Sequence, residues 1–240
     1  MTEQGSVSAT EALPGAPDRA IVTDTLTAKA LTALLDDARM FKRWAGVDPH
    51  VRQAHQSILA GFLETGTPPD IDRFNPGVLE DLAQRDLVHV RDGHIAVAYP
   101  FHADATDFRV NVGTTHLHAV CAIDALGVAA MTKRHVQVSC LCPVCKKPTG
   151  LDVASDGLTI SQITAPGARV WAGVEDVGSC AVDTQCRTMQ MFCSPEHLAE
   201  WRETQNPGAR GFDLSLEQAV QLGAAIFTPF LEPGKGGAET

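Results

Sequence analysis

The segment "HLHAVCAIDALG", residues 116–127, places a thiol and a carboxylic acid three positions apart in an otherwise apolar stretch. Side chains at positions i and i+3 of a helix are neighbours, so Cys121 and Asp124 could meet there. Apolar surroundings raise the pKa of a carboxyl group because its ionised form loses hydration, and a thiolate is a soft metal ligand and a nucleophile. The pair therefore indicates a thiolate that binds a soft metal beside an acid that delivers a proton. An isolated pair of this kind is more often a small buried thiol next to a capping Asp.

A second group of thiols lies in "SCLCPVCKKPTG", which contains Cys140, Cys142 and Cys145. Its C-P-x-C part resembles one half of a zinc knuckle, in which a tight turn aims two sulfurs at one metal ion. A structural zinc ion needs four ligands, and no second C-x-x-C is present in the chain. Structural zinc, redox or spare thiols, and simple packing therefore all remain open for this group.

Three further cysteines follow at wider spacing, namely Cys180, Cys186 and Cys193. They could act together only after folding brings separate strands into contact. The alternation of Met189, Met191 and Cys193 predicts a strand. Cys186 precedes this strand, near its start or in a loop, where side chains commonly serve sites. Taken alone, Cys186 is more often a packing residue.

The histidines offer weaker signals than the cysteines. His116 and His118 flank a predicted strand-to-helix junction and could bind metal, although solvated or capping roles are more common for such residues. The chain has no H-E-x-x-H pair, dinucleotide-binding glycine motif, P-loop or G-x-S-x-G elbow. Nucleotide cofactors and serine-hydrolase chemistry therefore have no support.

Length and composition describe a globular chain of 240 residues that is 44% hydrophobic and 20% charged. No apolar run approaches the roughly 18 residues that a membrane helix needs. The formal net charge of −10 weakens attraction to nucleic acid and to anionic membranes. Seven cysteines, an odd number, without a secretory signal favour reduced thiols over a disulfide framework. We therefore expect a cytoplasmic protein without nucleic-acid or membrane partners.

We expect four stretches along the chain. Residues 1–22 are predicted to be a disordered leader, and residues 233–240 a flexible tail. Residues 23–98 are predicted to hold an N-terminal helix and a winged-helix-like unit. Residues 99–232 are predicted to form a catalytic α+β domain.

The winged-helix-like unit is predicted from the order of the expected helices and strands. Helices are expected near residues 51–63 and 75–85, followed by two alternating runs around Asp92-Gly93, which is a strong hairpin signal. Acidic residues outnumber basic ones over residues 51–98, so a structural or substrate-covering role is favoured over DNA binding.

The second domain mixes short strands with a few helices after Pro100, which favours a mixed or antiparallel β-sheet with packed helices. Helices are expected near residues 118–131 and 215–227. A third begins at Pro195, because Ser194 is a good N-cap and Pro is favoured at the first helical position.

Two segments resemble the organomercurial lyase (alkylmercury lyase, MerB) family. "HLHAVCAIDALGVAAM" is similar to the family's apolar segment with a Cys and, three positions later, an Asp, which Cys121 and Asp124 match. "CRTMQMFCSPEHLAEW" is similar to the family's second cysteine segment, and counting back eight positions from Ser194 places Cys186 on the family's second catalytic cysteine. The resemblance extends over about residues 50–230, although only the two cysteine segments are specific.

The resemblance implies cleavage of a carbon–mercury bond by protonation, in mercury detoxification. Cys121 and Cys186 would hold the organomercurial substrate and the Hg(II) product, with Asp124 beside the metal as the general acid. The products would be a hydrocarbon and bound Hg(II), which passes to cytosolic thiols or to a mercuric reductase. No cofactor is required.

The sequence departs from the family pattern at Cys140, Cys142 and Cys145, which could bind structural zinc or collect mercury. The alternative function is therefore a protein of lyase fold that binds zinc or senses metal through these thiols, without mercury turnover. A second departure is Arg187, directly after Cys186, which could lower the pKa of a nearby thiol.

Overall fold

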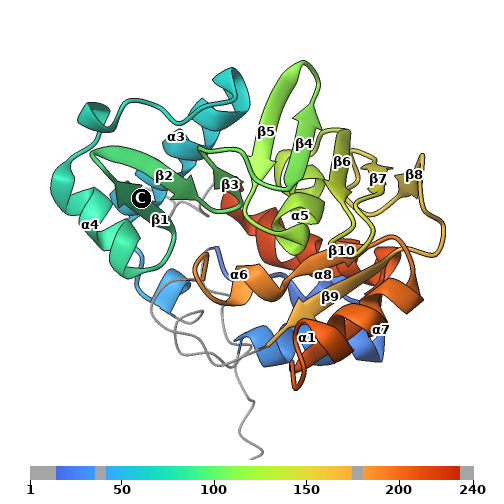
Figure 1. Ribbon diagram of the computed structural model, residues 1–240. Coiled ribbons are helices and arrows are strands. Elements are labelled where there is room, and N and C mark those ends of the chain that lie inside the picture. The colour runs from blue at the N-terminus through green and yellow to red at the C-terminus, as the bar shows by residue number, and fades with distance from the viewer. Residues whose placement is uncertain (1–14, 36–41, 175–180, 233–240) are drawn as a thin grey trace, which may run out of the picture.

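The computed structural model describes residues 15–35, 42–174 and 181–232, which form two antiparallel sheets and the helices around them (Figure 1). The helices of this part are η1 (Arg19–Ile21), α1 (Thr25–Leu35), α3 (Pro49–Thr65), η2 (Ile71–Arg73), α4 (Pro76–Gln84), α5 (Ala122–Thr132), α6 (Gln185–Thr188), α7 (Pro195–Thr204), α8 (Leu216–Phe227) and η3 (Thr228–Phe230). Its strands are β1 (Val88–Arg91), β2 (His94–Ala98), β3 (Phe101–His102), β4 (Phe108–Val112), β5 (Thr115–Ala119), β6 (Val136–Leu141), β7 (Pro148–Val153), β8 (Ile160–Ser161), β9 (Arg169–Gly173), β10 (Gln190–Phe192) and β11 (Gly211–Ser215).

The larger sheet has the strand order β1-β2-β3-β5-β4-β6-β7-β8, and the smaller sheet has the order β10-β9-β11. Every pairing in both sheets is antiparallel. Neighbouring strands of the larger sheet are mostly consecutive in sequence, so short turns connect them. The predicted α+β class with an antiparallel sheet is confirmed.

The hairpin expected at Asp92-Gly93 is present between β1 and β2. Both turn residues have positive φ, 52° for Asp92 and 74° for Gly93, which matches the twist of the flanking strands. The order α3, α4, β1, β2 is the one expected for residues 23–98, but β2 also pairs with β3, so the hairpin forms one edge of the larger sheet. The winged-helix description and the boundary between 98 and 99 stay predictions.

Helix α5 lies in the centre of the molecule, between the larger sheet and α8 (Figure 1). All of its residues up to Met131 are buried. The two helices can approach closely because glycines face each other where they cross: a Cβ on Gly127 would lie 2.7 Å from the backbone oxygen of Gly223, and one on Gly223 would lie 2.8 Å from the oxygen of Ile123. This crossing fixes the N-terminal end of α5, where the first candidate site lies.

The structure differs from the sequence-based expectation at the start of α5. The predicted helix of residues 118–131 begins only at Ala122, because the preceding residues form β5 and pair with β4. Alternating burial along β5 explains the difference, since a strand needs only every second side chain to be apolar. Cys121 is consequently the N-cap of α5 rather than a residue inside it.

The predicted leader also differs in its last part. Residues 15–22 contain η1, and the backbone N–H of Asp18 donates to the carbonyl of Ala225 in α8. Residues 1–14, the predicted tail of 233–240 and Cys180 lie outside the described residues.

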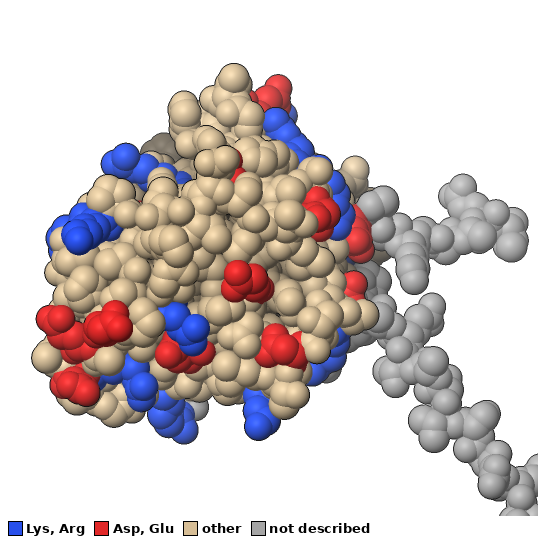
Figure 2. Space-filling model, turned by 90° about the vertical axis from the view of Figure 1, so that its right-hand side faces the viewer, with Lys and Arg blue, Asp and Glu red and all other residues tan. Residues whose placement is uncertain are grey.

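Acidic and basic side chains are interspersed on the face shown in Figure 2 rather than separated by sign. The formal net charge of −10 is therefore not gathered into one acidic patch on this face. Among the described helices, none is both long and apolar enough to cross a membrane.

Candidate active site

Cys121 and Asp124 meet at the N-terminus of α5. Cys121 has extended backbone (φ −150°, ψ 179°), and its Sγ accepts a hydrogen bond from the backbone N–H of Asp124 at 3.5 Å. A thiol thus occupies the capping position that Ser, Thr, Asp or Asn usually fills. The predicted proximity of the two residues is present, but it arises from this cap and not from stacking on one helical face.

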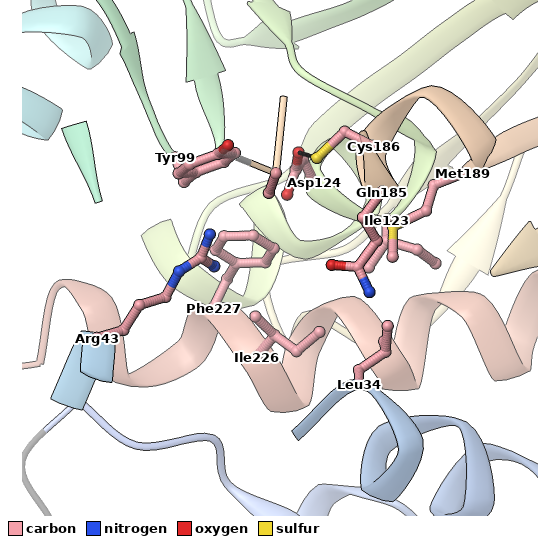
Figure 3. A pocket seen from close by; sticks show the side chains of 11 residues that line it. Leu34, Arg43, Tyr99, Ile123, Asp124, Gln185, Cys186, Met189, Ile226 and Phe227 are labelled. Atoms are coloured by element: carbon pink, nitrogen blue, oxygen red, sulfur yellow. Dashed lines mark hydrogen bonds between the residues drawn. The ribbon is translucent and has the colours of Figure 1, made fainter. Parts of the chain in front are cut away.

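Cys186 reaches the same place from α6, a single turn before β10. Its Sγ lies 4.0 Å from Oδ2 of Asp124 (Figure 3). The two sulfurs and a carboxylate oxygen of Asp124 all lie within 4.8 Å of one another, and all three residues are buried. Met189 closes the arrangement: its Sδ is 3.6 Å from Sγ of Cys121, and its carbonyl accepts from the N–H of Ala122. The fold therefore assembles the three residues that the sequence analysis selected.

The environment makes Asp124 protonatable near neutral pH. Burial raises its pKa to about 7, against smaller lowering effects from the hydrogen bonds with Cys121 and from Arg43. Burial likewise raises the pKa of Cys121 well above that of a free thiol. For Cys186 a hydrogen bond with Cys121 lowers the pKa, but burial and the charge of Asp124 raise it by more. Both thiols are therefore protonated at neutral pH before metal binds.

A buried ion pair supports the site from the N-terminal side. Arg43 donates to Asp86 at 2.6 Å, and its guanidinium lies 4.6 Å from the ring centre of Tyr99. Arg43 also lowers the pKa of both Asp124 and Cys186. Arg187, which the sequence suggested for this role, has a side chain that is 73% exposed. Arg43, the cation that lowers these two pKa values, lies far from Asp124 and Cys186 in the sequence, in a segment that carries no motif.

A small cavity of about 30 Å³ ends on Asp124 and Cys186 (Figure 3). Its walls are mainly apolar, and they include Tyr99, Ile123 and Phe227. This volume accommodates about one or two water molecules. A cavity this small limits the access of bulk water, and burial favours the neutral form of the carboxyl.

The two histidines considered as metal ligands, His116 and His118, have other partners. His116 Nδ1 lies 2.7 Å from Oδ1 of Asn111, and His118 Nδ1 accepts from the N–H of Thr106 at 3.1 Å. Neither belongs to the group formed by the thiols and Asp124 among the described residues. Their contacts fit the solvated or capping roles.

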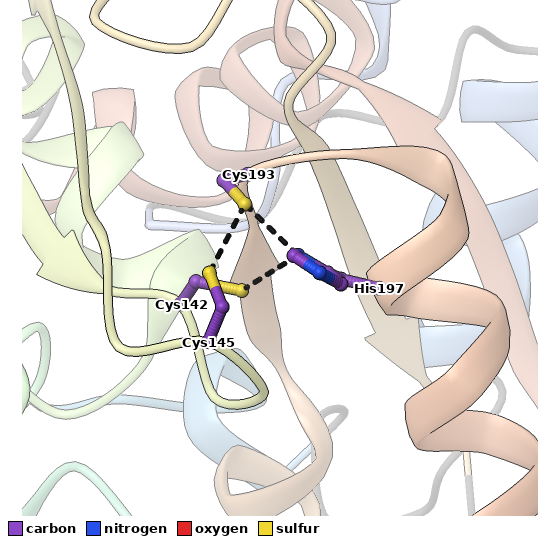
Figure 4. A group of neighbouring side chains, drawn as sticks. All are labelled: Cys142, Cys145, Cys193 and His197. Atoms are coloured by element: carbon purple, nitrogen blue, oxygen red, sulfur yellow. Dashed lines mark hydrogen bonds between the residues drawn. The ribbon is translucent and has the colours of Figure 1, made fainter.

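A second group of potential metal ligands lies outside this site (Figure 4). It consists of Cys142, Cys145, Cys193 and His197, whose ligand atoms all lie within 4.8 Å of one another. Cys140 of the predicted trio is not a member, because alternation along β6 turns it into the main core, where burial raises its pKa to about 12. From the sequence, Cys193 is expected to act as a ligand only after folding brings strands together, and His197 is not predicted. The C-x₃-H spacing at residues 193–197 is the signal that could have found it.

Two buried thiols beside a protonatable carboxyl, on an α+β scaffold, are a donor set suited to a soft metal ion. The model of the MerB family, alkylmercury lyase, matches residues 101–228, which is more than half of the chain and includes all three residues. The protein belongs to this family, and it is by family an enzyme, an alkylmercury lyase.

A solved structure, the crystal structure of the mercury-bound form of MerB2, matches with a TM-score of 0.67 and 22% identity over 87% of this chain and 100% of that chain. At this identity the likeness shows a shared fold. No curated protein sequence matches this chain.

Proposed function

We propose that this enzyme cleaves the carbon–mercury bond of organomercurials by protonolysis and releases a hydrocarbon and Hg(II). Cys121 and Cys186 hold the mercury, and Asp124 is the general acid. The observation that carries the proposal is the distance of at most 4.8 Å among the two buried sulfurs and a carboxylate oxygen. The similar structure is that of a mercury-bound protein, which supports a mercury site in this fold.

Capture begins with exchange of thiols on the substrate, which reaches the enzyme as R–Hg–SR′ with a small thiol attached. The sulfur of Cys121 binds mercury, and the displaced R′S⁻ leaves with the proton of the Cys121 thiol. Thiol exchange suits this site because the raised pKa of Cys121 keeps its proton until the metal displaces it. Mercury then lies within reach of the second sulfur.

Protonation of carbon follows from the acid form of Asp124. The carboxyl transfers its proton to the carbon atom, the Hg–C bond breaks with its electron pair on carbon, and RH leaves. As the sulfur of Cys186 binds mercury, its proton passes to the Asp124 carboxylate, whose Oδ2 lies 4.0 Å from Sγ of Cys186. Asp124 is thereby returned to its acid form. A pKa of about 7 suits a group that both donates and accepts a proton at neutral pH.

Product release needs an acceptor for Hg(II), since it is left bound by Cys121 and Cys186. Two cytosolic thiols, or the thiols of a mercuric reductase, can take the metal and return both protons to the cysteines. The net reaction converts R–Hg–SR′ and R′SH into RH and Hg(SR′)₂. No further cofactor enters this balance.

The test is release of hydrocarbon from purified, reduced protein that is given phenylmercury and excess thiol. Benzene in the headspace is measured by gas chromatography. Wild type should release benzene over many turnovers, and Cys121→Ser and Cys186→Ser should release none. Cys140→Ser is the matched control, because this thiol is equally buried but lies outside the site. Absence of benzene with wild type would refute the proposal, and full activity of Cys186→Ser would remove Cys186 from it.

A further inference from the structure

We propose that Cys142, Cys145, Cys193 and His197 form a structural zinc site that is independent of the lyase reaction. The four residues come from two segments that are far apart in sequence, the turn between β6 and β7 and the junction between β10 and α7. In Figure 4 their side chains point toward a common centre.

The distances within the group fit one tetrahedral ion. Zinc binds sulfur at about 2.3 Å and nitrogen at about 2.0 Å, so neighbouring ligand atoms of a tetrahedral site are separated by roughly 3.5–3.8 Å. Sγ of Cys145 and Sγ of Cys193 are 3.5 Å apart. Nδ1 of His197 is 3.7 Å from Sγ of Cys142 and 3.0 Å from Sγ of Cys193. The side chains therefore need only small adjustments to surround a metal ion.

The turn that carries Cys142 and Cys145 has the backbone of a zinc knuckle. The N–H of Cys142 donates to the carbonyl of Lys147, and the N–H of Lys146 donates back to the carbonyl of Cys142. Lys146 adopts a positive φ of 59°, which lets the chain reverse after the second cysteine.

The second pair of ligands is positioned by the start of a helix. Cys193 directly follows β10, and Ser194 caps α7 by accepting from the N–H of His197. The cap fixes the first turn of α7, so the imidazole of His197 lies on the same side as the sulfur of Cys193. Cys142 and Cys145, in a C-x₂-C pattern, supply two ligands. Cys193 and His197, in a C-x₃-H pattern, supply the other two that a structural zinc ion needs.

The donor set favours zinc in a structural role. Three thiolates and one imidazole form a closed Cys₃His set, in which no position is left open for substrate. The active-site group differs in offering two thiols and a carboxyl. A small separate core of Trp171, Phe192, Leu198 and Trp201 packs around Cys142. A metal ion bound by Cys142 would crosslink this small core and stabilise it.

A metal at this place would also hold the segment that carries part of the active site. Cys193 follows β10, and the residues just before β10 are Met189, which contacts Cys121, and the turn with Cys186. β10 itself is hydrogen-bonded to β9 of the smaller sheet. A zinc ion would therefore tie the end of this segment to the β6–β7 turn of the larger sheet.

The test is the metal content of the full chain, purified under reducing conditions from zinc-supplemented cells and measured by mass spectrometry. Wild type should carry about one zinc ion per chain. Cys145→Ser, Cys193→Ser and His197→Ala should lose it, whereas His197→Cys should keep it because a Cys₄ set also binds zinc. Cys140→Ser is the matched control and should keep its zinc, as should Cys121→Ser and Cys186→Ser.

A second readout uses Co²⁺ added to metal-free protein. Tetrahedral thiolate ligation gives intense visible absorption bands, which should appear in wild type and disappear in His197→Ala. If His197→Ala fails to fold, as judged by circular dichroism, the zinc content of wild type and of His197→Cys still tests the proposal. Wild type that takes up neither zinc nor cobalt, or a group that binds only Hg(II), would overturn the proposal. Neither readout depends on benzene release, so failure of one proposal is separable from failure of the other.

Discussion

The thiol of Cys186 and the carboxyl of Asp124 lie 4.0 Å apart although 62 positions separate them in the sequence. Each is carried at the first turn of a different helix, Asp124 on α5 and Cys186 on α6. The backbone hydrogen bond from Ala122 to Met189 joins the two segments. This relationship places a carboxyl that can hold a proton next to the sulfur that we propose binds mercury.

The rate of carbon–mercury cleavage should fall as the pH rises through about 7. In the proposed mechanism Asp124 donates from its acid form, and burial raises its pKa to about 7. Below this pH the carboxyl holds its proton, and above it the fraction of active enzyme falls about tenfold per pH unit. Single-turnover benzene release across pH 5–9 measures the profile. A rate that rises steadily over this range would contradict the role of Asp124 as acid.

Asp124→Asn should stabilise the folded protein at high pH. A carboxyl whose pKa is higher in the folded state than in the unfolded chain stabilises the fold below the unfolded pKa, and this contribution is lost as the pH rises through the folded pKa of about 7. At pH 8 the free energy of unfolding should therefore be larger for Asp124→Asn by on the order of 3 kcal/mol. Near pH 4 the difference should vanish. Urea denaturation at both pH values tests this, and equal stability at pH 8 would argue against a raised pKa.

Arg43→Gln should destabilise the protein strongly and move its pH profile. The substitution leaves Asp86 buried without its guanidinium partner, at a cost of about 3 kcal/mol or more. Because Arg43 lowers the pKa of Asp124, its loss should shift the falling limb of activity to higher pH. Arg187→Gln is the matched control, since this exposed arginine has a long contact of 3.7 Å with Asp183. Comparable losses of stability in both variants would contradict the assignment.

Gly127→Ala should weaken the crossing of α5 and α8. The added Cβ would lie 2.7 Å from the carbonyl oxygen of Gly223, so the helices must separate, at a cost of about 1–3 kcal/mol. Activity should fall as well, because α5 carries Asp124. Gly167→Ala serves as the control, since its Cβ would have only an ordinary contact of 3.8 Å with Pro195. Thermal melting of the two variants distinguishes the sites.

Short-range signals predicted much of the structure. The Asp-Gly hairpin and the helix start at Ser194-Pro195 are both present, because turn chemistry and capping are local. The sequence pattern predicts a start of α5 near residue 118, before its observed start at Ala122, because alternation in a short strand resembles the first turn of an apolar helix.

Long-range features were harder to predict. Arg43 acts on the site only through tertiary packing, and no spacing in the sequence points to it. Cys193 and His197 belong with Cys142 and Cys145, but the pairing of the two halves depends on how β10 and the β6–β7 turn meet. Cys121, Asp124 and Cys186 could be selected in advance because their two segments resemble a known family.

The most direct test of the central claim is a single turnover of phenylmercury in D₂O by wild type and by Asp124→Asn. Wild type should release benzene that carries one deuterium, which shows that solvent-exchangeable protons reach the carbon. Asp124→Asn should retain phenylmercury on the protein, detected as an added mass by mass spectrometry, and release no benzene. Release of benzene by Asp124→Asn at the wild-type rate would contradict the account.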